Sequence, residues 1–404
     1  MAAQPAQGIS PGRTAGLTAI LTPGTEAELE AIITEAVATS APLAIEGGGS
    51  RDIGRPVQAA QRVSTAAMTG ITLYEPSELV LSARAGTPLA EIEALLAANR
   101  QRLAFEPIDW RPLLGTTGEP TIGGVTASNA SGPRRIQAGA ARDHLIGIRA
   151  TTGRGETIKS GGRVMKNVTG YDFVKLLAGS WGTLGVLTEV TYKLLPTAET
   201  ETTLVFEGLD DVKAVEAMTT ALGTPFEITG AAHLPGPPAR TLLRFEGFAN
   251  SCEYRTERLR GLLAAFGTAD TLRDEASKSL WRAIRDVAPL EAGGADIIWR
   301  LSVKPTDGPA VAARLKAELG ARIVFDWSGG LIWAAVTGPA DGGAATVRGL
   351  IASHGGHATL IRAPHGLRAA IAPFQPEPPA VTTISSRIRE TFDPAGVLNP
   401  GRMG

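Results

Sequence analysis

Hydrophobic residues near the start of the chain recur at two different spacings. Over residues 26–39 they fall on one side of a helix, with Thr25 placed to cap its first turn and Glu28 to complete a capping box. Shorter apolar runs at residues 43–45 and 79–83 predict strands. The apolar face of the predicted helix consists of Leu29, Ile32, Ile33, Ala36 and Val37.

Helical and strand patterns continue through the first half of the chain. Thr87 and Pro88 suit the cap and the first position of a helix that runs through Asn99. Residues 115–196 are dense in glycine and in short β-branched runs. That composition predicts a mixed sheet with many tight turns.

The pattern changes again after Pro196. Strand-like and helix-like segments alternate in the next ~190 residues, which favours an α+β domain. Five prolines in residues 364–380 indicate a linker, and residues 381–391 are expected to form the last helix. The predicted strands are 203–206, 241–245, 297–303, 322–326 and 331–336, and the predicted helices are 209–222, 251–266 and 309–319.

Composition then excludes several classes of protein. A chain of 404 residues with 43% hydrophobic content suggests two or three globular domains. The formal net charge of −1 gives no reason to expect nucleic acid or an anionic membrane surface as a partner. The single cysteine, Cys252, cannot form a disulfide within the chain, a zinc–thiolate cage or an iron–sulfur cluster, and we expect no metal site. Without a secretory signal or a long apolar run, the cytoplasm is the expected location.

The first candidate for chemistry is the run from Gly47 to Arg51, which follows a predicted strand directly. Three glycines let the backbone approach a ligand closely, and successive N–H groups can converge on phosphate oxygens. An ordinary glycine turn explains this run equally well. The chain contains neither G-x-G-x-x-G nor G-x-x-x-x-G-K-[ST], so a Rossmann NAD site and a P-loop are unsupported.

Two further segments carry small and polar residues in unusual density. Residues 120–132 are mostly small, as a long flat ligand lying along a backbone requires, although a tightly packed glycine loop is the alternative. Residues 166–173 and 176–186 combine hydrogen-bonding groups with bare backbone, which suits the polar edge of a flavin ring. Tyr171 and Trp181 in these segments are equally compatible with a structural core.

Together these segments resemble the FAD-binding domain of the vanillyl-alcohol oxidase superfamily, also called PCMH-type. The stretches T-I-G-G at 121–124 and G-T-L-G-V at 182–186 are typical of it, as is F-D-P-x-G-x-L-N-P-G at 392–401. Within the superfamily, residues 131–135 and 164–172 are similar to the FAD-binding E subunits of bacterial glycolate oxidases. The resemblance covers about residues 18–197 and 391–403.

The resemblance implies an α+β fold with a two-subdomain PCMH-type FAD-binding domain at 1–197. A separate α+β cap, or substrate, domain would follow at 198–390, and 391–404 would return to the FAD domain. Some relatives tether the flavin through His or Cys near the first loop. Arg51 stands there instead, which implies non-covalent FAD. The implied cofactor-binding residues are Gly47, Gly48, Gly49, Ser50, Thr121, Ile122, Gly124, Ser128, Gly132, Gly182, Gly185 and Val186.

The implied function is that of the FAD-binding subunit of a glycolate (2-hydroxy acid) dehydrogenase complex. It would oxidise glycolate to glyoxylate and pass electrons to a cysteine-rich iron–sulfur partner, beside a catalytic flavoprotein sister subunit. Peripheral attachment to the inner membrane through these partners is one location compatible with this function. The catalytic base is not identified. Candidates for holding the substrate carboxylate are Arg111, Arg362, His365 and Arg368.

Two departures leave other functions open. The catalytic sister carries G-S-E-G-T, where this chain has Trp181 in place of the glutamate. The sister also carries H-x-G-D-G-N-x-H, whereas residues 353–358 here read S-H-G-G-H-A, with His354 and His357. The alternatives are therefore a non-catalytic, FAD-carrying scaffold or electron relay, and a stand-alone FAD-dependent oxidase of another alcohol or 2-hydroxy acid.

Overall fold

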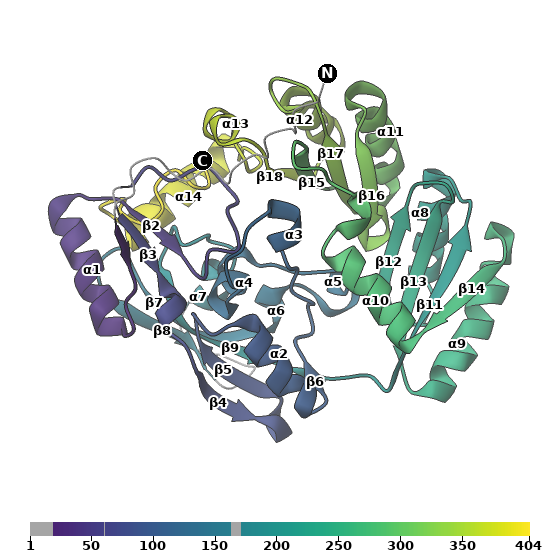
Figure 1. Ribbon diagram of the computed structural model, residues 1–404, viewed down its shortest axis with the longest axis horizontal. Coiled ribbons are helices and arrows are strands. Elements are labelled where there is room, and N and C mark those ends of the chain that lie inside the picture. Colours follow the sequence, from purple (N-terminus) through teal and green to yellow (C-terminus); the bar gives the residue numbers. More distant parts are fainter. Residues whose placement is uncertain (1–18, 60, 163–170) are drawn as a thin grey trace, which may run out of the picture.

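The computed structural model describes residues 19–59, 61–162 and 171–404 of the chain. Figure 1 shows two masses of secondary structure side by side, joined by a broad central contact. One is formed mainly by the first half of the chain and the other by an extensive sheet from the second half. Among the described residues, no helix is both long and apolar enough to cross a membrane.

The first mass contains two sheets of three or more strands, and a short antiparallel pairing of β6 (Gln101–Arg102) with β10 (Leu195–Pro196). A small parallel sheet has the strand order β1-β3-β2, and a larger sheet has the order β4-β5-β9-β7-β8. Every pairing in the larger sheet is antiparallel, so the expectation of a mixed sheet over residues 115–196 was wrong. The strands are β1 (Ala19–Leu21), β2 (Leu43–Glu46), β3 (Gln61–Ser64), β4 (Ile71–Glu75), β5 (Val80–Arg84), β7 (Leu145–Thr151), β8 (Thr157–Gly161) and β9 (Val186–Lys193).

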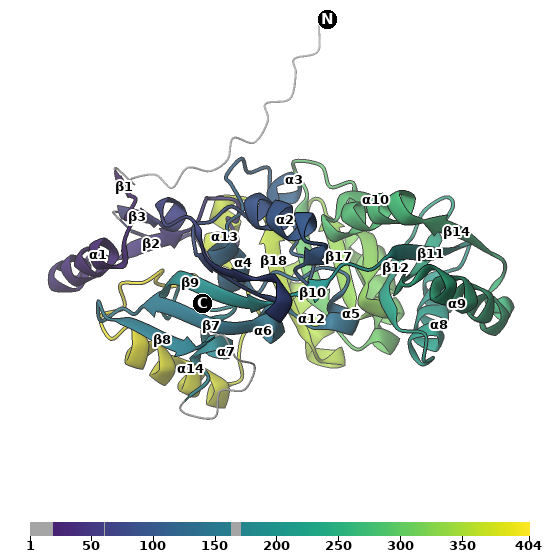
Figure 2. The same ribbon diagram turned by 90° about the horizontal axis from the view of Figure 1, so that it is seen from below.

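Helices pack around these two sheets. Figure 2 places the last helix of the chain beneath β7 and β8, within this first mass, and the amide of Gly153 donates to Phe392 O at its end (2.9 Å). The division of the chain at residue 390 stays a prediction. The helices here are α1 (Glu26–Thr39), α2 (Leu89–Ala98), α3 (Arg111–Leu114), α4 (Ile122–Ser128), α5 (Arg135–Ala138), α6 (Ala141–His144), α7 (Phe173–Leu177) and α14 (Pro379–Phe392).

The starts of α1 and α2 differ in how well they agree with the sequence prediction. The bounds of α1 are those expected, and Thr25 Oγ1 accepts from the Glu28 amide (3.2 Å). Glu28 closes the reverse bond on the amide of Gly24, one residue earlier than in a standard capping box (2.7 Å). Thr87 does not cap α2, which begins at Leu89, because its hydroxyl donates to Arg84 O instead (2.7 Å).

The second mass is built on an eight-stranded sheet with the order β14-β11-β13-β12-β16-β17-β15-β18. Each strand and helix predicted here from the sequence is present, and among the described residues five further strands or helices that were not predicted accompany them. The strands are β11 (Thr200–Glu207), β12 (Ile228–Leu234), β13 (Arg240–Gly247), β14 (Ala269–Arg273), β15 (Ile297–Ser302), β16 (Arg322–Asp326), β17 (Leu331–Val336) and β18 (His357–Arg362). The helices are α8 (Asp211–Leu222), α9 (Ala249–Leu262), α10 (Asp274–Arg285), α11 (Gly308–Leu319) and α12 (Ala344–His354).

The two faces of this large sheet have different environments. One face packs on α8, α9, α11 and α12 through apolar side chains such as Phe245, Trp299 and Phe325. The opposite face is turned toward the first mass, and its residues join the core that includes Trp110 and Trp333. Because successive side chains alternate between faces of a strand, any polar residue between these apolar ones points toward the seam between the two masses.

A network of buried charges lies in this seam. Arg244 on β13 makes two hydrogen bonds to Glu106 (both 2.8 Å), and its side chain is only 1% exposed. Arg134 is hydrogen-bonded to Glu246 on β13, and Arg102 reaches the same carboxylate (2.8 Å). Glu106 and Glu246 keep pKa values below the ordinary one because these arginines outweigh the effect of burial. We call these five residues the charge clasp.

The prolines of residues 364–380 do not produce a simple linker. Residues His365–Ala370 form a short helix, α13, on which Arg368 is buried. The Arg368 guanidinium donates to the carboxylate and the backbone oxygen of Asp52, directly after the first glycine loop (2.6 and 2.7 Å). The segment therefore ties the second half of the chain to the first.

Candidate functional site

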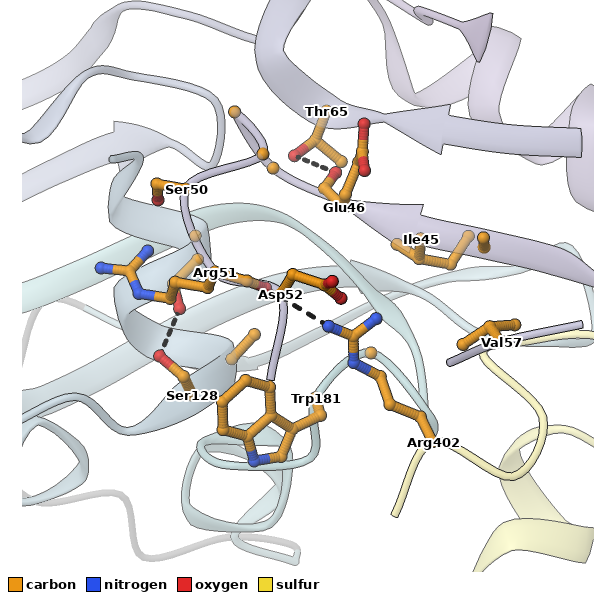
Figure 3. A pocket seen from close by; sticks show the side chains of 18 of the residues that line it. Ile45, Glu46, Ser50, Arg51, Asp52, Val57, Thr65, Ser128, Trp181 and Arg402 are labelled. Carbon is orange, nitrogen blue, oxygen red and sulfur yellow. Dashed lines mark hydrogen bonds between the residues drawn. The ribbon is translucent and has the colours of Figure 1, made fainter. Parts of the chain in front are cut away.

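A cavity of about 330 Å³ opens beside the first glycine loop. Figure 3 shows side chains from distant parts of the sequence around it, among them Arg51, Ser128, Trp181 and Arg402. Ten of the residues predicted to bind the cofactor line it, while Ile122 points into the core and Gly132 lies elsewhere. The predicted residues that line the cavity are Gly47, Gly48, Gly49, Ser50, Thr121, Gly124, Ser128, Gly182, Gly185 and Val186.

The glycine loop follows β2 and is pressed against another backbone segment. A Cβ atom on Gly48 would lie 2.0 Å from Glu119 O, and one on Gly47 would lie 2.5 Å from Thr121 Oγ1. Gly49 has a φ of +75°, a conformation that favours glycine. Glycine is therefore required here both for close packing and for backbone conformation, which leaves the loop's backbone bare toward the cavity.

The second small-residue segment forms a short helix rather than an extended lining. Thr121 caps α4, its hydroxyl accepting from the Gly124 amide (3.2 Å). Ile122 is fully buried in the core, so its side chain anchors the helix. Gly132 is not part of the cavity lining, and its carbonyl accepts a hydrogen bond from the Trp327 indole (3.1 Å). The cofactor roles of Ile122 and Gly132 stay predictions.

Arg51 brings a positive charge to this cavity. Its Nε and Nη2 atoms are buried and make no hydrogen bond within the described part of the chain. Burial lowers the pKa of Arg51 to about 10, so the guanidinium is still charged at neutral pH. A buried cation without a counter-charge is costly, which marks this wall as a place for an anion.

The third wall is held by a residue that sequence analysis did not single out. Asn399 accepts from the Ile45 amide (2.7 Å) and donates to Trp181 O (2.8 Å), so one amide joins β2 to the 181–186 segment. Trp181 adopts a φ of +54°, and the next residue, Gly182, has +72°. The position of Asn399 inside the recognised C-terminal motif was the signal that could have identified it.

The four candidates for carboxylate binding are placed differently from one another. Arg111 is bonded to Asp109 and Arg362 to backbone carbonyls including Leu113 O, and neither lines the cavity. Arg368 lines it but is bonded to Asp52, as described above. His365 also lines the cavity.

The three C-terminal histidines do not converge. His354 is bonded to Leu350 O at the end of α12 (3.0 Å), His357 begins β18, and His365 begins α13. No group of three or more potential metal ligands is found among the described residues. Residues 166–170 of the predicted flavin-edge segment lie outside the described residues, and Tyr171 is 82% exposed.

A second cavity, of about 210 Å³, adjoins the first. Ser128 and Trp181 line both cavities, so they form the boundary between them. The second cavity lies at the seam, where the loop after α4 faces β15, β17 and β18. Arg300 on β15 is the charged residue in a mostly apolar strand, a signal that sequence analysis passed over.

The fold and the first cavity agree with comparisons to known proteins. Residues 17–161 match the family model described as an FAD binding domain. The fold is similar to the solved structure of p-cresol methylhydroxylase with substrate bound, with a TM-score of 0.72 and 14% sequence identity. The match covers 98% of this chain and 91% of the p-cresol methylhydroxylase chain. The molecule is thus an FAD-binding protein with the PCMH-type fold, which confirms the predicted cofactor and fold class.

Sequence similarity narrows this class. Glycolate oxidase subunit GlcE of Escherichia coli (strain K12) is 33% identical over 375 residues, which cover 92% of this chain and 95% of the relative. Glycolate oxidase subunit GlcD of Bacillus subtilis (strain 168) is 42% identical over a shorter stretch of 92 residues, 22% of this chain and 20% of the relative. The chain belongs to the family of GlcE-type FAD-binding subunits.

Proposed function

We propose that this chain is the FAD-binding subunit of a glycolate dehydrogenase complex and that it oxidises a small 2-hydroxy acid at its own flavin. The observation that carries the proposal is the glycine-lined cavity, whose Arg51 makes no ion pair among the described residues, in a chain that matches the GlcE relative along almost its whole length. Both parts matter, because family membership suggests the reaction and the cavity suggests that flavin binding is retained.

The residues of the first cavity fit FAD in shape and charge. The bare backbone of the 47–49 loop offers N–H groups to a diphosphate, and Arg51 supplies a buried positive charge beside it. Ser128 and Trp181 lie at the end that meets the second cavity, where the flavin ring would face a substrate. We expect non-covalent binding, because neither His nor Cys occurs in the loop after β2.

FAD supplies the redox chemistry, since its flavin ring can accept a hydride from an alcohol carbon. The protein then has to hold the substrate, orient its α-carbon and accept the hydroxyl proton. The second cavity is the place for this, because it adjoins the first and is lined by Trp110, Trp333 and Phe374. Aromatic walls of this kind exclude water and limit the length of the substrate.

Partners follow from the fate of the electrons. With Cys252 as its single cysteine, the chain cannot ligate an iron–sulfur cluster by itself. The GlcE and GlcD relatives are both named as subunits of glycolate oxidase, which supports a hetero-oligomer. We therefore include in the proposal a flavoprotein sister and a cysteine-rich iron–sulfur subunit as electron acceptor.

One alternative has specific support. Trp181 replaces the sister's glutamate, and the His-rich motif is incomplete around His354 and His357. These departures favour a subunit that carries FAD as a scaffold or relay without oxidising substrate.

The test combines three measurements on the full chain. The purified chain should be yellow and should release all its flavin into the supernatant on acid precipitation. Glycolate should bleach this flavin without oxygen, whereas turnover with an artificial dye should be low until both partner subunits are co-expressed. A colourless chain that cannot be reconstituted would refute FAD binding. An unbleached flavin in the isolated chain, beside an active complex, would favour the scaffold.

A further inference from the structure

The second cavity contains an unusual concentration of positive charge. Arg300 reaches it from the large sheet, and Arg135 reaches it from α5 on the other side of the seam. His357 lines the same cavity from the start of β18. These three residues are more than 50 positions apart from one another in the sequence. Asn129 and Ser131, close to Arg135 in the sequence, also line the cavity and are polar but uncharged.

Strand register explains why the large sheet presents these residues together. Arg300 on β15 pairs with Thr359 on β18 and with Trp333 on β17. His357 lies two residues before Thr359 and therefore on the same face. The neighbouring Trp299 points to the opposite face, into the apolar cluster under α11 and α12. The sheet thus turns one polar row toward the seam, directly at the cavity.

The two arginines of this cavity are not neutralised. Within the described residues, neither the Arg135 nor the Arg300 side chain has a hydrogen bond or an ion pair to a carboxylate. Instead both guanidinium groups lie over the ring of Trp327, at 4.8 and 5.0 Å from its centroid. The contact with an aromatic face orients the two cations without cancelling their charge.

The surrounding titratable groups leave the positive charge in place. Burial, followed by the charge of Arg135, lowers the pKa of Arg300 to about 10, so Arg300 stays protonated at neutral pH. Burial raises the pKa of the nearby Asp326 to about 7, so its carboxyl carries only part of a negative charge there. The pKa of His357 is lowered by burial and by both arginines, which keeps that ring neutral.

We propose that the second cavity is the carboxylate-binding subsite for a small 2-hydroxy acid, with Arg300 and Arg135 holding the carboxylate beside the flavin cavity. This inference rests on the proposed function and deepens it, because it assigns the substrate contact to this chain. Two guanidinium groups match a carboxylate in charge and in planar hydrogen-bonding geometry. Ser128 and Trp181, shared by both cavities, put the bound acid next to the flavin.

The assignment differs from the candidates considered from sequence. Arg111, Arg362 and Arg368 already have protein partners, so using any of them for substrate would require breaking hydrogen bonds. Arg135 and Arg300 need no such change. Thr359 and neutral His357 supply uncharged polar groups in the same cavity, suited to the substrate hydroxyl.

The experiment measures binding of oxalate, a non-oxidisable carboxylate, to the FAD-loaded full chain by calorimetry and by the shift of the flavin spectrum. Arg300→Met and Arg135→Met should each weaken oxalate binding by roughly tenfold or more, since each removes charge-assisted hydrogen bonds. Arg314→Met, which removes an exposed arginine paired with Glu318, is the matched control and should leave binding unchanged. Arg300→Lys keeps the charge and should give an intermediate loss.

Each result has a defined meaning. Wild-type protein that holds FAD but binds no oxalate would overturn this inference while leaving the FAD-binding function intact. Equal binding by wild type and both methionine variants would place the carboxylate elsewhere and overturn it too, as would equal affinity for sulfate and oxalate. If a methionine variant loses FAD, oxalate binding by Arg300→Lys is the deciding measurement. An unchanged oxalate affinity of Arg300→Lys would then overturn the assignment of the subsite. A wild-type chain without FAD would instead refute the proposed function.

Discussion

The charge clasp and the two cavities use the same side chain in opposite ways. In the clasp, Arg244 meets both oxygens of Glu106 at 2.8 Å, and Arg134 is bonded to Glu246. In the cavities, Arg51 and Arg300 are less deeply buried, and neither makes an ion pair within the described residues. All four lie in or beside the seam and the cofactor cavity, so location by itself does not separate structure from function.

What separates the two regions is charge balance. A buried ion pair removed from water approximately offsets its own desolvation, so the clasp mainly fixes how the two masses meet. A buried cation left unpaired destabilises the protein until an anion arrives. The unpaired arginines therefore mark binding sites, and the paired ones mark the contact that positions those sites. The following predictions test this distinction, from the largest expected effect to the smallest.

The largest effect is expected at Gly48, because the cavity depends on close backbone packing. Gly48→Ala would place a Cβ atom 2.0 Å from Glu119 O, a contact that backbone movement has to relieve. We expect loss of FAD from the purified protein, measured as the ratio of flavin to protein absorbance. Gly261→Ala adds the same atom in open space on α9 and should retain FAD. Full FAD retention by Gly48→Ala would reduce the loop to an ordinary turn.

Breaking the clasp comes next. Arg244→Met leaves Glu106 without its bidentate partner in the interior, and one broken buried pair typically costs about 3–5 kcal/mol. The free energy of unfolding in urea should fall by an amount in that range. Arg314→Met removes an exposed pair and should change it by under ~1 kcal/mol. Similar values for both variants would show that the clasp does not stabilise the fold.

Replacing Arg51 should change the stability of the FAD-free protein in the opposite direction to replacing Arg244. Arg51→Met removes a buried charge that lacks a partner, so the FAD-free protein should become more stable to urea. The same variant should bind FAD roughly tenfold or more weakly, because a charge-assisted contact to the cofactor is lost. Unfolding of FAD-free protein and FAD titration give the two numbers. Destabilisation of the FAD-free variant would mean that Arg51 is structural.

The prediction with the smallest effect per step concerns pH dependence, unit by unit of pH. Burial raises the pKa of Asp326 to about 7 in the folded protein, so the folded state holds this proton more tightly than the unfolded state. Between pH ~4 and ~7 this carboxyl therefore lowers stability as pH rises, by at most about 1.4 kcal/mol per unit. Asp326→Asn should remove this contribution. The free energy of unfolding of the variant, measured relative to that of the wild type, should therefore increase as pH rises. A difference that is constant with pH would contradict the assignment.

Sequence reasoning succeeded where a local pattern determined the structure. The bounds of α1 and the strands β15–β17 follow from periodicity, and the glycine loop follows from its composition. The missed features depend on pairing between distant segments. Nothing near Arg300 in the sequence indicates that Arg135 lies across the same cavity, because strand register and the seam bring them together.

The same limit applies to polar partners. Arg368 looked available in sequence, but its partner Asp52 is 316 positions away. Proline content at 364–380 suggested a linker, whereas the short helix α13 uses this segment to reach the cofactor cavity. Motif resemblance identified the cofactor, yet it could not show which arginines stay unpaired, since that property belongs to the assembled fold.

The amide of Asn399 has a consequence for the order of events during biosynthesis. It joins Ile45 to Trp181, but 354 positions separate it from Ile45 along the chain. At ~5–20 residues per second, a ribosome needs roughly 20–70 s to travel between these codons. The nascent chain therefore displays a glycine loop and an emerging sheet long before the tie that closes the cofactor wall exists. We expect a prematurely terminated chain that lacks this asparagine to retain less FAD, because its 181–186 segment would not be tied to β2.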